Sequence, residues 1–118
     1  NPVVKSGPLS IDRATRAVVV SGYPLYLTKK EFAVLEILML RKGATITKRM
    51  IMDHVYGDGG GPELGIVQVF VCKLRKKLSA LSGGETFIDT IWGGGYRMRD
   101  IVGVQDQEDQ AAMHKTAA

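Results

Sequence analysis

The residues best suited to bind a charged partner are the lysines and the arginine of segment 63–81, ELGIVQVFVCKLRKKLSAL. No acidic residue occurs after Glu63 in this segment, so its lysines and its arginine are not neutralised by close neighbours. On a helix, one side would carry small and basic residues, with Gln68 and Arg75 at its flanks. Such cations could neutralise phosphates, and a helix with this surface fits a DNA major groove. A solvated face with ordinary lysines is the alternative. The predicted outward residues are Gly65, Val69, Cys72, Lys73 and Lys76.

The other side of this segment is apolar. Residues of this kind recur at i, i+3, i+4 and i+7, which is the spacing of one face of a helix. The pattern predicts a helix over 63–81 with its apolar stripe against the core. The stripe consists of Leu64, Val67, Phe70, Val71, Leu74 and Leu78.

No combination of residues fits a catalytic or metal site. His54 and His114 are far apart, and neither has a carboxylate at a spacing that would make a ligand pair. Cys72 has no partnered base. The glycine strings match neither G-x-G-x-x-G after a strand nor G-K-[ST]. The sequence therefore predicts no enzyme activity, no metal and no cofactor.

Length and composition predict one compact domain. The chain has 118 residues, of which 45% are hydrophobic, and carries a net charge of +4. This charge suits a polyanionic partner, although a modest basic excess is weak evidence. A single cysteine excludes an internal disulfide and a cysteine-based zinc site, as in a reducing cytoplasm. No apolar run reaches membrane length and no signal-type segment opens the chain, so we expect a soluble cytoplasmic protein without a membrane partner.

The first part of the chain predicts a linker followed by a small sheet. Residues 1–8 contain two prolines and a glycine and have little apolar surface. Three short runs of branched and aromatic residues follow, which predicts three antiparallel strands with a tight reversal at 22–24. The runs are 9–12, 17–21 and 25–27.

Two helices are predicted next. Thr28 and Glu31 form a capping-box pattern before an apolar periodic segment that ends near Gly43. Thr47 can cap a second helix that ends near Tyr56 and buries Met50, Ile51 and Val55. The glycine-rich segment 57–62 then predicts a loop that bulges out before the cationic helix.

The last ordered element is predicted to be a hairpin. Segments 87–92 and 96–99 alternate at strand period around three glycines. Arg97 and Arg99 then project from one face, and Tyr96 and Met98 from the other. From Val102 the chain is polar and lacks periodicity, which predicts a disordered tail over 102–118 and a domain over 9–101.

Four strings in this order resemble the OmpR/PhoB-type effector domain of bacterial response regulators: LTKKEFAVLEIL, ITKRMIMDHVYG, VFVCKLRKKL and TIWGGGYRMRD. The resemblance covers residues 9–100, and within the family the segments LRKGATITK and VFVCKLRKKL are most similar to one cell-cycle regulator. It implies an α+β winged helix-turn-helix with an N-terminal antiparallel sheet, three helices and a C-terminal β-hairpin wing.

The resemblance also implies a function, which is sequence-specific binding of double-stranded DNA to control transcription. Helix 63–81 would enter the major groove and wing 87–99 would lie at the minor groove. An N-terminal receiver domain with a phosphorylated aspartate would precede residues 1–8, which would end the interdomain linker. Pairing of two copies on tandem half-sites is usual for the family.

Family positions imply the contacts with DNA. Lys73 and Arg75, assisted by Lys76, match positions that meet the DNA backbone, and Val69 could pack on a thymine methyl. The alternatives are solvated lysines and an exposed valine without a role. Thr47 could instead be only a helix cap, and either tyrosine could pack in the core. The implied phosphate and wing contacts are Thr47, Lys48, Tyr56, Thr90, Tyr96 and Arg97, and Cys72 completes the groove-facing set.

Three departures from the family pattern leave a second function open. Gly65 and Gln68 replace residues that are usually charged, and Gly94 stands where the wing tip usually has an arginine. We therefore expect weaker or altered DNA binding. Phe70 replaces a usually polar residue and is expected at the core edge. The alternative is a protein-interaction module whose loop 57–62 contacts RNA polymerase through Asp58, Gly59, Gly60 and Pro62.

Overall fold

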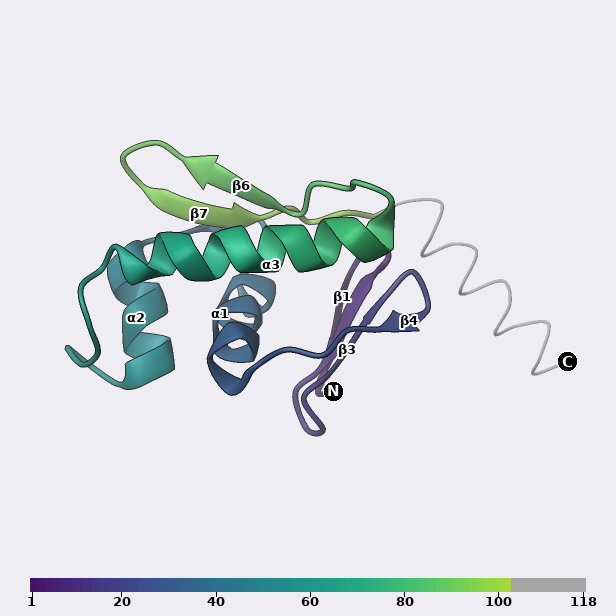
Figure 1. Cartoon of the computed structure of the whole chain (residues 1–118), viewed down its shortest axis with the longest axis horizontal. Helices are drawn as coiled ribbons and strands as arrows, with labels where there is room; N and C mark the ends of the chain where they lie inside the picture. The colour runs from purple at the N-terminus through teal and green to yellow at the C-terminus, as the bar shows by residue number, and fades with distance from the viewer. Residues whose placement is uncertain (103–118) are drawn as a thin grey trace, which may run out of the picture.

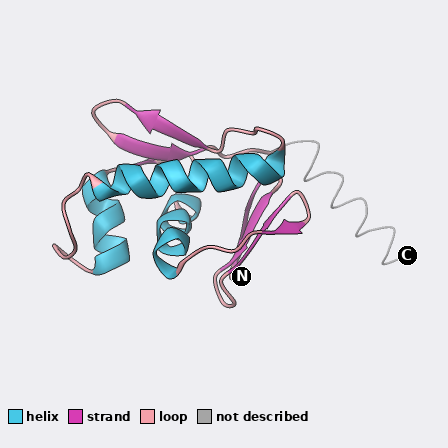
Figure 2. Cartoon of the chain, viewed as in Figure 1, coloured by secondary structure: helices cyan, strands magenta, loops and turns pink. Residues whose placement is uncertain are grey.

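The computed structural model describes residues 1–102, and these form two antiparallel sheets and three helices (Figures 1 and 2). The long helix α3 extends across the domain, and α1 and α2 pack against it and against each other. This is the α+β winged helix-turn-helix expected from the sequence. In chain order the elements are β1 (Val3–Ser6), β2 (Leu9–Asp12), β3 (Ala17–Val20), β4 (Tyr23–Pro24), α1 (Lys29–Leu40), β5 (Thr45–Ile46), α2 (Lys48–Tyr56), α3 (Ile66–Ser82), β6 (Ile88–Ile91) and β7 (Gly95–Met98).

The N-terminal sheet has four strands in the order β1-β2-β3-β4, one more than predicted. Residues 1–8 are not a linker throughout, because Val3–Ser6 form the edge strand β1 in antiparallel register with β2. The prolines that favoured a linker flank this strand instead of interrupting it. The ordered domain therefore begins at Val3, six residues before the predicted start at Leu9.

The last strand of this sheet also differs from the prediction. The expected strand over 25–27 is wrong, since β4 consists of Tyr23 and Pro24 and the chain then leaves the sheet. The reversal occurs at Ser21 and Gly22, both of which have positive φ. Glycine adopts a positive φ without steric cost, which suits Gly22 to the second position of this turn. The turn therefore begins at Ser21, one residue before the predicted reversal at 22–24.

The starts and ends of α1 and α2 agree with the local signals in the sequence. At the start of α1, the Thr28 hydroxyl accepts from Glu31 N (3.2 Å) and the Glu31 carboxylate accepts from Thr28 N (2.9 Å). This confirms the predicted capping box. Thr47 caps α2 by accepting from Met50 N at 3.1 Å. In α2, Ile51 and Met52 are buried, whereas Met50 and Val55 are only partly buried.

The predicted hairpin is confirmed and belongs to a three-stranded sheet in the order β5-β7-β6. We call the hairpin β6–β7 with its turn, residues 88–98, the wing. On β7, Ile46 of β5 pairs with Tyr96, so one side of the wing is attached immediately before α2. Gly95 makes this possible, since a Cβ there would lie 2.1 Å from the Ile46 carbonyl oxygen.

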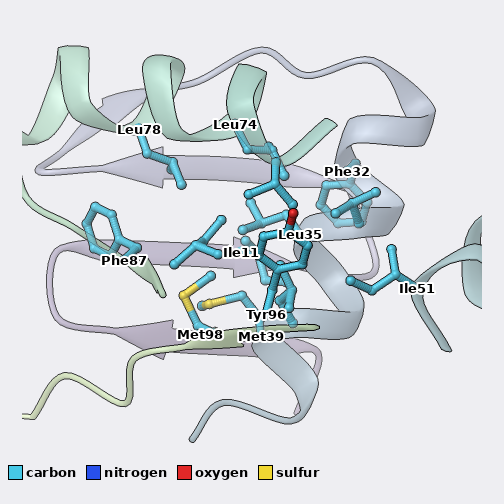
Figure 3. Close-up of a cluster of buried hydrophobic side chains, with 14 of the residues drawn as sticks. Ile11, Phe32, Leu35, Met39, Ile51, Leu74, Leu78, Phe87, Tyr96 and Met98 are labelled. Carbon is cyan, nitrogen blue, oxygen red and sulfur yellow. The ribbon is translucent and has the colours of Figure 1, made fainter. Parts of the chain in front are cut away.

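The core joins both sheets and all three helices (Figure 3). Helix α3 contributes the predicted stripe, of which Val67, Val71, Leu74 and Leu78 are buried. Phe70 is partly buried at the core edge, as expected. From the wing, Tyr96 and Met98 point into the same cluster (Figure 3). A single core therefore fixes α3 and the wing relative to each other.

The C-terminal segment was predicted to be a disordered tail over 102–118. Of the predicted tail, only Val102 is described and it is exposed; residues 103–118 lie outside the described part. Within residues 1–102, none of the helices combines the length and the apolar character needed to cross a bilayer.

Candidate nucleic-acid interface

Helix α3 presents the outward surface that the sequence predicts. Lys73, Lys76 and Cys72 are exposed, and Val69 is 45% exposed although it is branched and apolar. Among residues 1–102, neither Lys73 nor Lys76 is in a hydrogen bond or an ion pair. We call Val69, Cys72, Lys73 and Lys76 the α3 outer face. Its cations are available to a polyanion.

The start of α3 differs from the prediction. The helix begins at Ile66 rather than at residue 63, and Gly65 precedes it without a side-chain cap. Leu64, expected in the core stripe, lies in the turn before the helix and is 39% exposed. Leu64 is therefore a surface residue, because the helical periodicity on which its burial was predicted has not yet begun there.

Arg75 points away from the outer face and toward the wing. Its Nε and Nη2 donate to the Ile88 carbonyl oxygen at 3.2 and 2.9 Å, and Nη2 also donates to Thr90 Oγ1 at 2.8 Å. The guanidinium carbon lies 5.7 Å from the centre of the Tyr96 ring. Arg75 and Thr90, which were both predicted to contact the DNA backbone, are thus hydrogen-bonded to each other.

A groove of about 540 Å³ lies between the wing, the start of α2 and the start of α3. Thr47 and Lys48, predicted to contact phosphate, line it and are exposed. The Thr47 hydroxyl is already used as the α2 cap. The groove is also lined by Leu64, which was predicted in the core stripe, and by three residues that the sequence did not single out, namely Arg49, Ile91 and Trp92.

The wing tip carries the most exposed large hydrophobic side chain in the described part of the protein. Trp92, the only tryptophan of the chain, is 91% exposed. An exposed indole offers a large apolar surface and an N–H donor, a combination that is enriched at interfaces. The type and the turn position of Trp92 could have indicated this from the sequence, whereas its degree of exposure could not.

The wing arginines and Tyr96, predicted to contact DNA, all have contacts within the protein. Arg97 and Arg99 project from one face as predicted, but both are paired with Asp89, at 3.4 and 2.9 Å. The hydrogen bond from Arg99, opposed in part by desolvation, lowers the pKa of Asp89. Tyr96 is only 5% exposed and packs in the core, where alternation along β7 places it beside Met98.

The loop between α2 and α3 extends from residue 57 to residue 65 and is held by hydrogen bonds. The Asp53 carboxylate accepts from Gly59 N at 2.9 Å, and Arg49 donates to the Gly60 carbonyl oxygen at 3.3 Å. Asp58, Gly59 and Pro62 are exposed and Gly60 is half-buried. Tyr56, predicted to reach a phosphate, is half-buried under Lys30, whose Nζ lies 4.8 Å from the ring centre.

The potential metal-ligating side chains in the described part of the chain do not gather in one place. Residues 1–102 contain no group of three or more His, Cys, Asp or Glu side chains that could hold a metal ion. His54 is exposed, and its Nε2 lies 2.8 Å from the Glu36 carboxylate. This pair links α2 to α1 and is a surface contact between helices.

Residues 22–98 match the family described as transcriptional regulatory protein, C terminal. The chain belongs to this OmpR/PhoB-type family of response-regulator DNA-binding domains. The match extends from the turn before β4 to the end of the wing, and it includes the α3 outer face and the groove.

Among OmpR/PhoB-type proteins, the chain is similar to the cell cycle response regulator CtrA of Brucella anthropi. The two are 49% identical over 98 residues, which are 83% of this chain and 42% of that protein. The similarity to a cell-cycle regulator expected from the sequence is therefore confirmed. The chain spans about two fifths of the length of this relative.

Solved OmpR/PhoB-type structures show the same architecture. The DNA-binding domain of CpxR from E. coli has a TM-score of 0.74 at 24% identity and covers 86% of this chain and 100% of that one, which shows the fold. The DNA-binding domain of the response regulator AdeR, solved in complex with an intercistronic region, has a TM-score of 0.70 at 26% identity and covers 79% of this chain and 95% of that one.

Proposed function

We propose that this domain binds double-stranded DNA sequence-specifically and controls transcription as the effector domain of a two-component response regulator. Helix α3 enters the major groove and the wing lies at the adjacent minor groove. One observation carries the proposal: the α3 outer face is exposed, acid-free and basic, and it is rigidly backed by the core stripe. A rigid cationic helix is the element that a major groove accommodates.

The two lysines of the outer face act on the DNA backbone. Lys73 and Lys76 neutralise phosphates, and this release of counterions supplies most of the affinity. Val69, exposed between them and the helix start, packs on a thymine methyl and thereby contributes to base readout. Cys72 lies on the same face and is small enough to let the helix approach the bases.

A second set of contacts lies along the groove beside the wing. The first turn of α2 has backbone N–H groups without helical partners, which suit a phosphate at Thr47 and Lys48. Trp92 extends from the wing tip toward the minor groove, where apolar side chains contact sugars and base steps. Arg97 contributes positive charge only in part, because Asp89 offsets it.

The full-length protein is proposed to be a cytoplasmic bacterial regulator with an N-terminal receiver domain and to pair on tandem half-sites. Support comes from the similarity to CtrA, of which the aligned region is 42%. Residues 1–2, immediately before β1, then continue directly from the interdomain linker.

A salt-dependent binding experiment tests the proposal. Duplexes are selected from a random pool, and the wild type is titrated with a selected duplex and a scrambled one at several salt concentrations. We expect tighter binding to the selected duplex, and we expect Lys73→Gln to flatten the plot of log affinity against log salt by about one unit. The control is Lys5→Gln, the same change of charge on β1, which should leave that slope unaltered.

The outcome that rejects DNA reading is equal binding of both duplexes together with no effect of Lys73→Gln. That outcome favours the alternative, a protein-interaction winged helix that contacts RNA polymerase through loop 57–62. The loop supports this alternative because it is exposed and yet held in place by Asp53 and Arg49. Binding of RNA polymerase to the wild type, weakened by Asp58→Ala and Pro62→Ala, would be its positive test.

A further inference from the structure

The cations of α3 do not share one role. Lys73 and Lys76 point outward without a protein partner among residues 1–102, whereas Arg75 directs three hydrogen bonds at β6. Three of the five N–H donors of Arg75, those on Nε and Nη2, are therefore directed at protein acceptors. The role of Arg75 therefore depends on the geometry of these hydrogen bonds and not only on its charge.

We propose that Arg75 is a positioning residue that fixes the wing against α3, so that both reach DNA as one rigid unit. This inference rests on the proposed function, because the wing must contact DNA for its position to matter. Two of the three hydrogen bonds converge on the Ile88 carbonyl oxygen, and the third reaches Thr90, one residue before the last residue of β6.

The place of Arg75 in the fold explains why such a tie is needed. β6 is an edge strand, hydrogen-bonded to β7 on one side only. Its base is anchored by Phe87 and Ile88, which are buried, but Thr90 and the tip beyond it are outside the core. On the opposite edge, β5 pairs with β7. Arg75 attaches the free edge, and the wing is then held from both sides.

Guanidinium geometry makes this role specific to arginine. The planar group offers two donors to one carbonyl and a further one to a hydroxyl, and its face lies 5.7 Å from the Tyr96 ring centre. A lysine has the same charge but a single flexible ammonium, which cannot reproduce the fork. Replacement by lysine therefore separates a positioning role from simple phosphate neutralisation.

The first measurement needs no DNA. Trp92 is the only tryptophan of the chain and lies at the wing tip, so its fluorescence anisotropy reports wing motion. We expect Arg75→Lys and Arg75→Gln to lower this anisotropy equally and to speed amide exchange in β6, while Lys76→Gln leaves both unchanged. If Arg75→Gln does not fold, Thr90→Val removes the outer acceptor and should produce a smaller change in the same direction.

The second measurement uses the selected duplex. We expect Arg75→Lys and Arg75→Gln to weaken binding by about tenfold with little change in salt slope, whereas Lys76→Gln lowers the slope by about one unit. Trp92→Ala in an Arg75→Gln background should add little, because the wing contact is already lost.

The proposal is overturned if Arg75→Lys matches the wild type in anisotropy and affinity, while Arg75→Gln reduces the slope by about one unit at unchanged anisotropy. Arg75 would then be a phosphate contact. A failure of the proposed function is different: it appears as equal binding of selected and scrambled duplexes by the wild type, and leaves the anisotropy result in the free protein intact.

Discussion

At the scale of single residues, adjacent glycines of the wing turn have unequal constraints. A Cβ on Gly95 would lie 2.1 Å from the Ile46 carbonyl oxygen, and its φ of 131° disfavours other residues. A Cβ on Gly94 would lie 3.1 Å from Ile91 Cγ2 and 3.2 Å from Thr45 Cγ2, so that these methyl groups would have to move by a few tenths of an ångström. Backbone packing therefore requires glycine at position 95, whereas the nearest neighbours of position 94 are side-chain methyl groups.

We predict that Gly94→Arg restores a wing cation at low cost. Its unfolding free energy should fall by less than about 1 kcal/mol, and its salt slope on the selected duplex should rise by about one unit. Gly95→Ala is the matched comparison and should lose more than about 3 kcal/mol. Urea denaturation and the duplex titration measure both; equal destabilisation of the two variants would contradict this account.

Trp92 leads to a second prediction at this scale. Since the indole is 91% exposed, Trp92→Ala should change the unfolding free energy by less than about 0.5 kcal/mol. Affinity for the selected duplex should nevertheless fall by about tenfold. In the wild type, addition of that duplex should shield Trp92 from acrylamide quenching. Unchanged quenching on saturation with DNA would exclude Trp92 from the interface.

At the scale of elements, α1 depends on a buried carboxylate that bridges two helices. Glu31 completes the capping box of α1 and also accepts from Lys77 Nζ of α3 at 2.7 Å. Burial would raise the pKa of Glu31, but the hydrogen bonds from Lys77 and Thr28 outweigh it and the pKa lies below its ordinary value. The charge of Glu31 therefore stabilises the contact between α1 and α3.

The sign of this shift predicts how stability depends on pH. Because the folded pKa is lowered, the stabilisation is complete above the ordinary carboxyl value of 4.5 and is lost as pH falls through the folded pKa. Glu31→Gln keeps an acceptor for Thr28 N but removes the charge. We expect it to cost about 0.5 kcal/mol at pH 7, since Lys77 is partly exposed, and progressively less below pH 4.5.

Denaturant titrations of both proteins from pH 7 to pH 3 measure this difference. Glu36→Gln is the control, because Glu36 pairs with Arg13 and His54 on the surface and has no role in a cap. A stability difference for Glu31→Gln that stays constant over this range would show that the Glu31 charge is not the cause.

At the scale of the whole molecule, β1 connects the N-terminal sheet to the segment after the wing. The Ser6 hydroxyl is buried, donates to the Arg99 carbonyl oxygen and accepts from Ile101 N at 2.9 Å. Gly7 N donates to the Ile101 carbonyl oxygen at 2.8 Å. The segment that enters the domain is therefore joined directly to the base of the wing.

We predict that Ser6→Ala destabilises the domain by about 1–3 kcal/mol, because it leaves the polar backbone groups of Arg99 and Ile101 without their buried partner. Ser10→Ala on the neighbouring strand β2 is the matched control and should change stability by less than about 0.5 kcal/mol. Thermal and urea unfolding measure both. Equal effects of the two substitutions would show that the buried hydroxyl is not specifically required.

Much of the fold was predictable from local patterns. The cap of α1, the cap of α2, the apolar stripe of α3 and the alternation of Tyr96 with Met98 all depend on residues a few positions apart. Their physics is complete within one element, so a sequence is sufficient to identify them. The exposure of Lys73 and Lys76 follows from the same stripe.

The errors concern interactions between distant segments. β1 was missed because a four-residue strand between prolines gains its stability from pairing with β2, which its own composition does not reveal. For Tyr96, core packing was one of two alternatives that the sequence left open, because an aromatic residue suits a core and a surface equally well. The pairing of Arg97 and Arg99 with Asp89 was not predictable either, because it depends on the register between β6 and β7.

By itself, the sequence determined the three helices, the caps of α1 and α2 and the basic side of α3, since each follows from spacing over one or two helical turns. The direction of Arg75 was decided only by the tertiary structure, because its acceptors lie 13 and 15 residues further along the chain. The bond of Ser6 to Arg99 spans 93 residues. A polar side chain that could bind several different groups binds the one that the fold brings within hydrogen-bond distance.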